Sequence, residues 1–531
     1  MDNLITGDDA IYIGIVALFC GDFTMYFKRK SNIIFRNYDS FGYITDNRNF
    51  GYKKTDNNGN DIGDKIVSQS GAVFLSALGR KPQNLEDIVN KINIQFINVD
   101  IETIKNDARG FYSILEQDGF IVSGESSKEC DEKDLGFSYR NLKPKNGIND
   151  SYPTKGPEKT TQEFLDEYFK DTRQLISLHI EITSKCNERC VHCYIPHDKK
   201  VNHINTELFF SILEQCKEMK VLHLTLTGGE PMLHKSFIDF LKKCKEYNMS
   251  VNVLSNLTLL SDEILEEMKE NRLLSVQASL YSMDSEIHDA ITQTKGSFEI
   301  TKNAILKLKE NDVPLQISCP IMKQNRNCYK DVLKWAEIHN LHVGCDYIII
   351  ARCDNTTQNL GSRLSIDDIK KVIQERIVGQ PKYSDLMIKE SEKKKNITPD
   401  DIVCSVCHSS ICIAENGNVY PCAGWQGYVV GNVNEKSLED IWNNSKDVQY
   451  LRGLRRRDFP KCNECFEKDY CTMCMVRNAN EHPLGNPLAV NEYFCSIAKL
   501  NKEMILNRKN IIKEVGVESI FLRMPQASDL Q

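Results

Sequence analysis

The sequence predicts an α/β protein whose central domain is a parallel sheet, curled into a partial (β/α)6 barrel. Short apolar segments alternate with amphipathic helical segments from residue 175 onward, which is typical of successive β/α units. The predicted strands are 178–182, 221–226, 251–254, 276–280, 315–318 and 347–350, with helices such as 208–219 and 237–247 between them. Active sites of such folds lie at the carboxyl ends of the strands.

A smaller domain is predicted on each side of this sheet. Residues 1–125 predict a winged-helix-like domain, and 126–170 form a polar linker. The elements of the first domain are a hairpin over 31–54 with its turn at 46–49, helices at 70–78, 85–92 and 101–115, and a strand at 120–122. The central domain covers 171–380, a cysteine-dense domain covers 400–500, and the tail 501–531 begins as a helix.

Composition excludes several classes of protein. The net charge of −7 argues against a nucleic-acid binder, which needs a basic surface. No segment reaches the roughly 18 apolar residues that a membrane span needs. The apolar run 10–20 follows Asp8 and Asp9 rather than a basic leader, so we expect no signal peptide, a start at Met25 and a cytoplasmic protein.

The twenty cysteines therefore favour metal binding over disulfides. The first group follows the strand at 178–182, where Cys186, Cys190 and Cys193 have the spacing C-x3-C-x2-C. Three thiolates on one loop can hold three irons of a [4Fe–4S] cube and leave the fourth iron open. A zinc knuckle or free thiols are the structural alternatives.

This loop resembles the signature of the radical S-adenosylmethionine (SAM) superfamily, whose core is a partial TIM-like barrel, over residues 175–375. The next strand ends in Gly228, Gly229, Glu230 and a proline. Two glycines allow a close backbone approach, and the resemblance implies that this turn binds the amino group of SAM.

The resemblance also implies further SAM contacts at Ser255, Asn256, Ser279 and Ile348, although each position also suits an ordinary loop or core residue. Thr292 stands where relatives often carry an arginine, so the usual guanidinium–carboxylate pair with SAM is in doubt.

A second cysteine region resembles the SPASM extension of radical SAM proteins, which houses two auxiliary [4Fe–4S] clusters. Two zinc-ribbon sites are the alternative that spacing alone leaves open. By resemblance, the first auxiliary cluster has the ligands Cys407, Cys422 and Cys474, with Cys404 as a possible fourth. The second has Cys462, Cys465, Cys471 and Cys495. We interpret Cys412, between two isoleucines, as a small hydrophobic residue, and Cys216, Cys244 and Cys319 as core residues.

Two functions compete for the N-terminal domain. Residues 61–125 contain six Lys or Arg and ten Asp or Glu, which argues against DNA binding. Their pattern resembles the PqqD-like recognition element, which binds a leader peptide as an added strand. A purely structural role is the third possibility.

Together these resemblances imply a radical SAM/SPASM maturase with three [4Fe–4S] clusters and SAM as cofactors. Its partners would be a ribosomally made precursor peptide with a leader and a reductant such as flavodoxin or ferredoxin. The expected product is a thioether between cysteine sulfur and carbon, as in sactipeptide or ranthipeptide maturation.

Three alternatives stay open. Sulfatase-maturating relatives carry an aspartate, thought to be the base, where this chain has Ala423, which disfavours that activity. Carbon–carbon crosslinking is another product class. A peptide-binding iron–sulfur scaffold that does not turn over SAM is the non-enzymatic alternative. The sequence identifies no general base.

Overall fold

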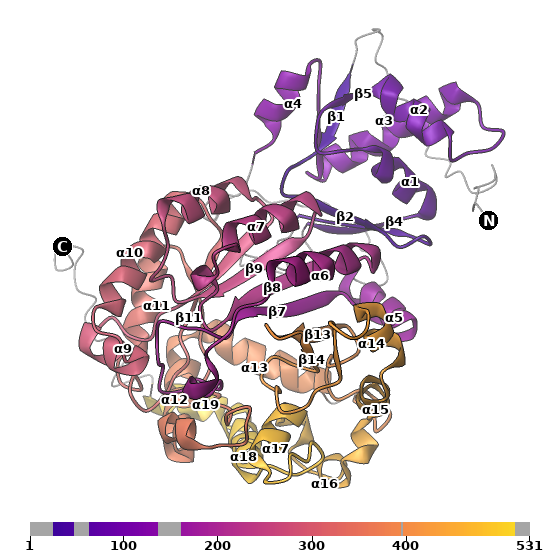
Figure 1. Cartoon of the computed structure of the whole chain (residues 1–531). Helices are drawn as coiled ribbons and strands as arrows, with labels where there is room; N and C mark the ends of the chain where they lie inside the picture. Colours follow the sequence, from indigo (N-terminus) through magenta and orange to yellow (C-terminus); the bar gives the residue numbers. More distant parts are fainter. Residues whose placement is uncertain (1–24, 47–62, 136–160, 395–396, 516–531) are drawn as a thin grey trace.

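The computed structural model describes residues 25–46, 63–135, 161–394 and 397–515. An N-terminal domain stands on one end of a larger body, in which a parallel sheet is covered by helices and followed by a cysteine-rich domain (Figure 1). No helix within these residues is both long enough and apolar enough to cross a bilayer.

The N-terminal domain combines two antiparallel three-stranded sheets with helices. The first sheet has the order β5 (Gln83–Asn84), β1 (Tyr26–Arg29), β6 (Ile121–Gly124), and the second has the order β2 (Ile34–Asn37), β3 (Gly42–Thr45), β4 (Asp64–Val67). The helices are α1 (Gln69–Ala77), α2 (Leu85–Asn93), α3 (Ile101–Gln117) and α4 (Ser127–Lys133). Their N-caps are Ser68, Asn84, Asp100 and Ser126, whose side-chain oxygens accept backbone N–H groups of the first turn.

The three helices predicted here are confirmed within two residues, and the strand at 120–122 corresponds to β6. β2 and β3 form an antiparallel hairpin that is connected by residues 38–41, and β3 also pairs antiparallel with β4. The predicted turn at 46–49 lies, except for residue 46, outside the described residues. The strand predicted at 50–52 lies outside the described residues. The sequence analysis missed β1, which is only four residues long and contains the buried Lys28; this ammonium group is neutralised by Asp131 and Asp134.

The N-terminal domain docks at the amino ends of the parallel strands. The Arg36 guanidinium donates to the carbonyl of Val221 at 3.1 Å and to that of Asn248 at 2.7 Å, just before β8 and β9. Apolar side chains of β2, β3 and α5 (Thr161–Thr172) pack there against Leu222 and Leu273. The domain therefore lies at the end of the sheet opposite its carboxyl edge.

One nine-stranded sheet runs through the rest of the chain. Its order is β12 (His342–Gly344), β11 (Leu315–Ser318), β10 (Leu274–Ser279), β9 (Ser250–Ser255), β8 (His223–Gly228), β7 (Ser177–Thr183), β13 (Ser410–Ile413), β14 (Asn418–Tyr420), β15 (Gly431–Asn432). The helices that connect β7 to β12 are α6 (Thr206–Glu218), α7 (Phe237–Glu246), α8 (Asp262–Glu270), α9 (Ser285–Thr292), α10 (Ser297–Glu310) and α11 (Tyr329–Ile338). The six strands from β7 to β12 are parallel, which confirms the predicted fold class.

The sixth parallel strand is not where the sequence placed it. The apolar segment 347–350 is not a strand, and β12 lies earlier, at His342–Gly344. The carbonyl groups of this segment accept hydrogen bonds from side chains, namely those of Arg363 and Asn359, instead of from a neighbouring strand. An apolar run alone does not distinguish these two arrangements.

The two faces of the parallel sheet differ in polarity. Leu178, Ile180 and Ile182 of β7 face the same way as Leu224, Leu226 and their partners on β9 to β11, and they share a core with the helices. The opposite face, called the inner face here, carries His179 and Glu181 beside Thr225 and Thr227. This alternation follows from the two-residue period of a strand, and it leaves the inner face free for polar chemistry.

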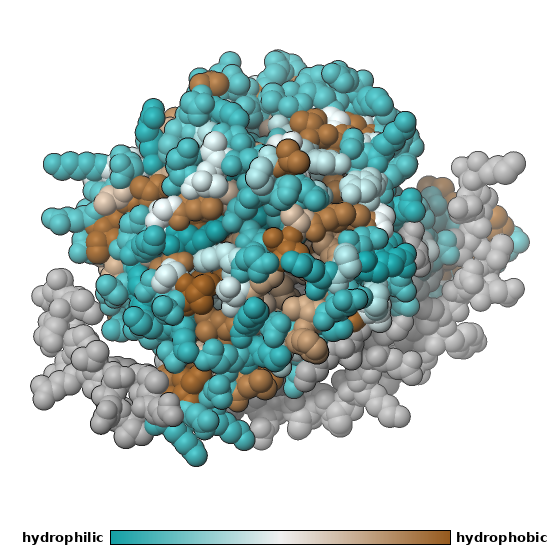
Figure 2. Space-filling view, turned by 90° about the horizontal axis from the view of Figure 1, so that it is seen from below, coloured by the Kyte–Doolittle hydropathy of each residue, from teal (hydrophilic) through white to brown (hydrophobic). Residues whose placement is uncertain are grey.

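The cysteine-rich domain extends this sheet rather than forming a separate one. β13 pairs in parallel with β7, and β14 and β15 continue antiparallel. The remaining helices are α12 (Ile366–Gly379), α13 (Pro381–Lys394), α14 (Leu438–Asn444), α15 (Lys446–Gly453), α16 (Pro460–Asn463), α17 (Met475–Glu481), α18 (Glu492–Leu506) and α19 (Arg508–Val515). Figure 2 shows the face at the bottom of Figure 1, on which hydrophobic residues occur in separate groups among hydrophilic ones.

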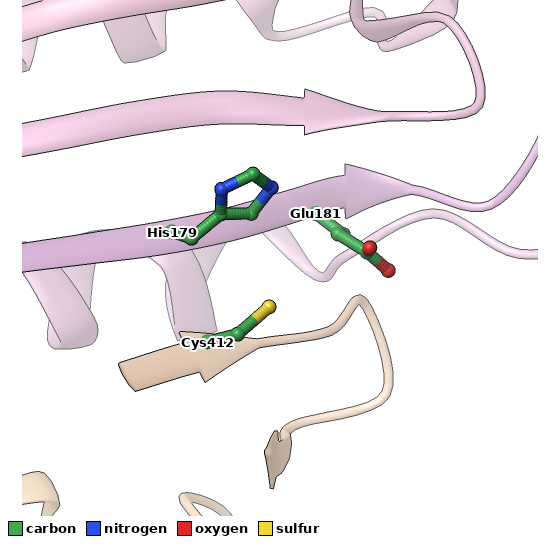
Figure 3. A group of neighbouring side chains, drawn as sticks. All are labelled: His179, Glu181 and Cys412. Carbon is green, nitrogen blue, oxygen red and sulfur yellow. The ribbon is translucent and has the colours of Figure 1, made fainter. Parts of the chain in front are cut away.

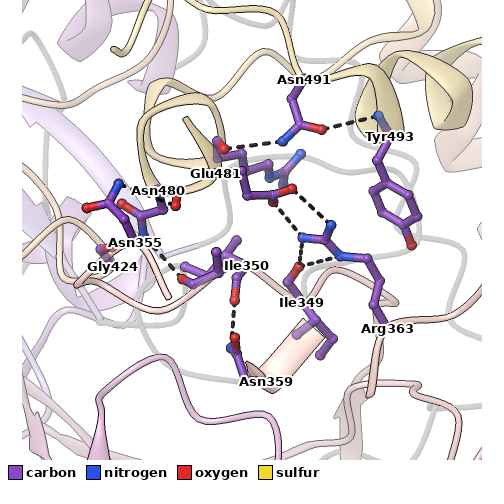
Figure 4. Close-up of polar contacts among 12 residues, drawn as sticks. Ile349, Ile350, Asn355, Asn359, Arg363, Gly424, Asn480, Glu481, Asn491 and Tyr493 are labelled. Atoms are coloured by element: carbon purple, nitrogen blue, oxygen red, sulfur yellow. Dashed lines mark hydrogen bonds and ion pairs between the residues drawn. The ribbon is translucent and has the colours of Figure 1, made fainter. Parts of the chain in front are cut away.

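A buried ion pair connects the sheet domain to the cysteine-rich domain (Figure 4). The Arg363 guanidinium donates two hydrogen bonds to the Glu481 carboxylate, at 3.0 and 2.6 Å, and two to the Ile349 carbonyl. The side-chain amide of Asn480 donates to the carbonyls of Ala351 and Gly424. This cluster fixes the segment after β12 against α17.

We predict that Glu481→Ala lowers the free energy of unfolding by about 3–5 kcal/mol, because it leaves the Arg363 charge buried without its partner. Urea unfolding monitored by circular dichroism measures the loss. The control is Lys436→Ala, which breaks an exposed pair with Asp440 and should cost less than about 1 kcal/mol. Equal losses of unfolding free energy in the two variants would show that the Arg363–Glu481 pair does not stabilise the contact between the two domains.

Candidate active site

The first cysteine loop begins where β7 ends. Backbone N–H groups of Arg189 and Val191 donate to the carbonyls of Thr292 and Ile291 at the end of α9, at 3.0 and 2.9 Å. Burial raises the pKa of Cys186 to about 11, and it raises the pKa of Cys190 with help from the nearby Glu188 carboxylate and the Cys193 and Cys186 thiols. Three half-exposed thiols therefore share a site where their charged forms need a cationic partner.

The two glycines after β8 are required by the packing of the protein itself. Gly228 has a φ of +138°, and a Cβ there would overlap the carbonyl oxygen of Thr183. A Cβ on Gly229 would overlap the carbonyl of Lys185. The N–H groups of Gly229 and Glu230 donate to those same two carbonyls, each at 2.8 Å. The turn at 228–230 is thus bonded directly to the backbone that leads into the cysteine loop.

The Glu230 carboxylate is buried and organises the next strand end. It accepts hydrogen bonds from the N–H of Asn256 at 2.8 Å, the Ser255 hydroxyl at 2.8 Å and the N–H of Met232 at 3.0 Å. Burial raises its pKa to about 7, although these hydrogen bonds lower it. The Asn256 amide reaches Asn187 in the cysteine loop at 3.0 Å. Three predicted SAM contacts are therefore brought together beside that loop.

The other predicted contacts lie at the same carboxyl edge. Ser279 is half-buried at the end of β10, next to Ser318 of β11. Ile348 is half-buried in the segment that Arg363 holds. Thr292 is buried, and its hydroxyl bonds with Ser297 at 2.7 Å, so it supports α9 instead of reaching a ligand.

The thiols predicted for the first auxiliary cluster lie near one another in the structure. Burial and, to a lesser extent, the nearby thiols of Cys474 and Cys422 raise the pKa of Cys404 to about 11. Burial raises that of Cys407 to about 12, again with Cys404 and Cys422 nearby. Cys407 has a φ of +58°, a left-handed conformation that is uncommon outside glycine and is often found at functional sites.

The second auxiliary group lies between α16 and α18. Burial and, to a lesser extent, the nearby thiols of Cys495, Cys462 and Cys465 raise the pKa of Cys471 to about 11. Whether Cys404 and each of the other thiols is a ligand stays a prediction.

Spacing of the sulfur atoms favours iron–sulfur clusters over zinc in all three groups. Among the described residues, none of the groups brings three sulfur atoms within 4.8 Å of one another. Tetrahedral zinc, with Zn–S bonds of about 2.3 Å, needs sulfurs about 3.8 Å apart, whereas each ligand of a cube binds a different iron. The spacing of these mostly half-buried thiols therefore fits [4Fe–4S] clusters better than zinc.

The first loop and the first auxiliary group converge on Glu181. The Tyr194 hydroxyl, next to Cys193, donates to one carboxylate oxygen at 3.1 Å, and the Gln426 amide, four residues after Cys422, donates to the other. The N–H of Cys353 also donates to the Tyr194 carbonyl at 3.0 Å. Sequence reasoning missed Glu181 because nothing in the strand pattern shows which residues lie opposite it.

Comparison with known families agrees with this geometry. Residues 180–336 match the model of the Radical SAM superfamily, and residues 404–466 match that of the SPASM iron–sulfur cluster-binding domain. The protein therefore has a radical SAM core followed by a SPASM domain. It is a radical SAM enzyme with SAM and [4Fe–4S] clusters as cofactors.

The individual relatives share low sequence identity with this chain. The chain is 25% identical over 327 residues to the tungsten-containing aldehyde ferredoxin oxidoreductase cofactor-modifying protein of Pyrococcus furiosus, covering 55% of this chain and 88% of that protein. It is 27% identical over 314 residues to the antilisterial bacteriocin subtilosin biosynthesis protein AlbA of Bacillus subtilis, covering 57% of this chain and 67% of AlbA. The crystal structure of Streptococcus suis SuiB bound to precursor peptide SuiA matches with a TM-score of 0.54 and 16% identity, over 88% of this chain and 99% of SuiB, which shows the shared fold.

We predict that replacing Cys186, Cys190 and Cys193 together by alanine removes about four irons per chain and abolishes SAM cleavage, because this loop then has no iron ligands. Iron analysis and chromatography of 5′-deoxyadenosine measure both effects. Cys216→Ala is the control, since this buried cysteine on α6 lies in the core. Intact turnover in the triple variant would contradict the assignment.

We also predict that Gly229→Ala lowers 5′-deoxyadenosine formation by about 100-fold, because the new Cβ displaces the backbone at Lys185 and small misplacements in an active site cost rates of this size. Gly361→Ala is the matched control, because a Cβ at Gly361 meets no atom within 4 Å. Similar rates of 5′-deoxyadenosine formation in the two variants would show that the close approach of Gly229 to the Lys185 backbone does not position the site.

Proposed function

We propose that this enzyme modifies a ribosomally made precursor peptide by joining a cysteine sulfur to carbon. The observation that supports the proposal is the pair of hydrogen bonds from Tyr194 and Gln426 to Glu181, which joins the segment of the first cysteine loop to that of the first auxiliary group. Thioether formation removes two hydrogens from the peptide, so it needs both a hydrogen-atom acceptor and an electron acceptor near the substrate.

When bound, SAM and the first cluster would supply the difficult chemistry, which is hydrogen-atom abstraction from an unactivated C–H group. The protein's own residues hold and orient the groups involved. Cys186, Cys190 and Cys193 would hold one cluster, and the turn at Gly228 and Gly229 keeps that loop in place. Glu181 joins the segment of the first cysteine loop to that of the first auxiliary group, because it accepts hydrogen bonds from Tyr194 and Gln426.

The comparisons support a peptide rather than a small molecule as substrate. SuiB, whose structure contains a precursor peptide, shares the fold across 88% of this chain, and AlbA is a bacteriocin biosynthesis protein. The P. furiosus relative modifies a cofactor, so sequence similarity to the core alone does not choose between substrates.

The N-terminal domain is proposed to capture the leader of the precursor as a PqqD-like, winged-helix recognition element. β4 lies at the edge of the order β2–β3–β4, so a peptide strand can add beside it. Because this domain docks at the amino ends of the strands, the leader and the modified segment must reach opposite ends of the sheet. We infer that the precursor has a spacer between these two parts.

We predict that anaerobic co-expression with a cysteine-containing precursor peptide gives a product lighter by two hydrogens per crosslink. High-resolution mass spectrometry measures the loss, and fragmentation locates the bond. A peptide with serine in place of cysteine should stay unmodified, because it has no sulfur to transfer.

A precursor without its leader is the second control, and it should be modified far less. Loss of two hydrogens from the serine peptide would favour carbon–carbon crosslinking instead. Absence of 5′-deoxyadenosine under all conditions would favour a non-catalytic scaffold.

A further inference from the structure

Three potential metal ligands meet on the inner face of the sheet, apart from the three cysteine groups. They are His179 and Glu181 on β7 and Cys412 on β13 (Figure 3). One nitrogen, oxygen or sulfur atom of each lies within 4.8 Å of the other two. In the described part of the chain, no other group of three such residues meets this distance.

Strand register places these residues together. In the parallel pairing of β7 with β13, Cys412 lies directly opposite His179, and Glu181 is two residues further along the same face of β7. Ligands on paired strands are held more rigidly than ligands on loops. The arrangement depends on the β7–β13 pairing, which is why sequence analysis interpreted Cys412 as a small hydrophobic residue.

The imidazole of His179 has an atom without a partner. Its Nε2 is inaccessible to solvent and makes no hydrogen bond with the described residues. Burial and, to a lesser extent, the neighbouring His223 lower the pKa of His179 to about 4, so the ring is neutral and one of its nitrogens retains a lone pair. A buried polar atom without a partner is costly unless something absent from the chain itself satisfies it.

The Glu181 carboxylate is already oriented. Tyr194 and Gln426 each donate one hydrogen bond to it, which leaves a further lone pair on each oxygen. Groups that orient a ligating carboxylate in this way are typical of metal sites. Cys412 is fully buried beside it. Burial raises the pKa of Glu181 to about 8 and raises that of Cys412, so a cation bound between them would replace their protons and stabilise the charged forms.

We propose that His179, Glu181 and Cys412 bind a single Zn²⁺ ion. One nitrogen, one oxygen and one sulfur form a donor set that zinc accepts. This set cannot hold a [4Fe–4S] cube in the manner of the cysteine groups, because it offers one thiolate. Three protein ligands leave a fourth coordination position, as in catalytic rather than structural zinc sites.

The first test is zinc X-ray absorption on the full-length protein, reconstituted anaerobically with iron and sulfide and then supplied with one equivalent of Zn²⁺. The zinc edge is separate from that of iron, so the clusters do not interfere. We expect one sulfur at about 2.3 Å and nitrogen or oxygen neighbours at about 2.0–2.1 Å. A shell of four sulfurs would place the zinc in a cysteine group and overturn the proposal, as would failure to retain zinc after desalting.

The second test compares variants by metal analysis. His179→Gln and Cys412→Ser should each lower zinc affinity by at least about 10-fold while the iron content stays unchanged. Cys244→Ser is the matched control, because this cysteine is equally buried but lies on α7. Unchanged zinc affinity in both site variants would contradict the proposal. The readout does not depend on peptide modification, so it stands or fails separately from the proposed function.

Discussion

The parallel pairing of β13 with β7 is the constraint on which the rest of the structure depends. It makes the cysteine-rich domain a continuation of the radical SAM sheet and brings residues more than 200 positions apart into register. Without it, Gln426 would not reach Glu181, and Cys412 would not lie opposite His179. The Arg363–Glu481 pair is a second connection between the same two domains, and it holds the segment after β12 against α17.

The two faces of this sheet differ in polarity and therefore in role. Leu178, Ile180 and Ile182 bury the outer face of β7 under the helices, and that burial stabilises the fold. The inner face has His179, Glu181 and Thr183 at the alternate positions. Leu178, Ile180 and Ile182 therefore support the fold, whereas His179 and Glu181 between them face the other side, and the strand ends in the loop of Cys186.

Sequence reasoning succeeded where the signal is local. The spacing of Cys186, Cys190 and Cys193 and the turn at Gly228 lie on single loops, and five of the six parallel strands follow from apolar runs. It failed where tertiary contacts determine the local structure. Side chains donate hydrogen bonds to backbone carbonyls of 347–350, and this apolar segment is not a strand. It also missed the role of Glu181, whose partners come from distant segments. Gly228 and Gly229 were predicted to let the backbone approach a ligand closely, yet a Cβ at either position would meet Thr183 or Lys185 of the protein itself.

The central claim is that the three thiols at the end of β7 hold a cluster with one iron open to SAM. Electron paramagnetic resonance of the dithionite-reduced, full-length protein, with and without SAM, tests it most directly. The account predicts that SAM changes the signal of one cluster and leaves the signals of the others in place. Identical spectra in both conditions, from protein shown to contain all its iron, would contradict it.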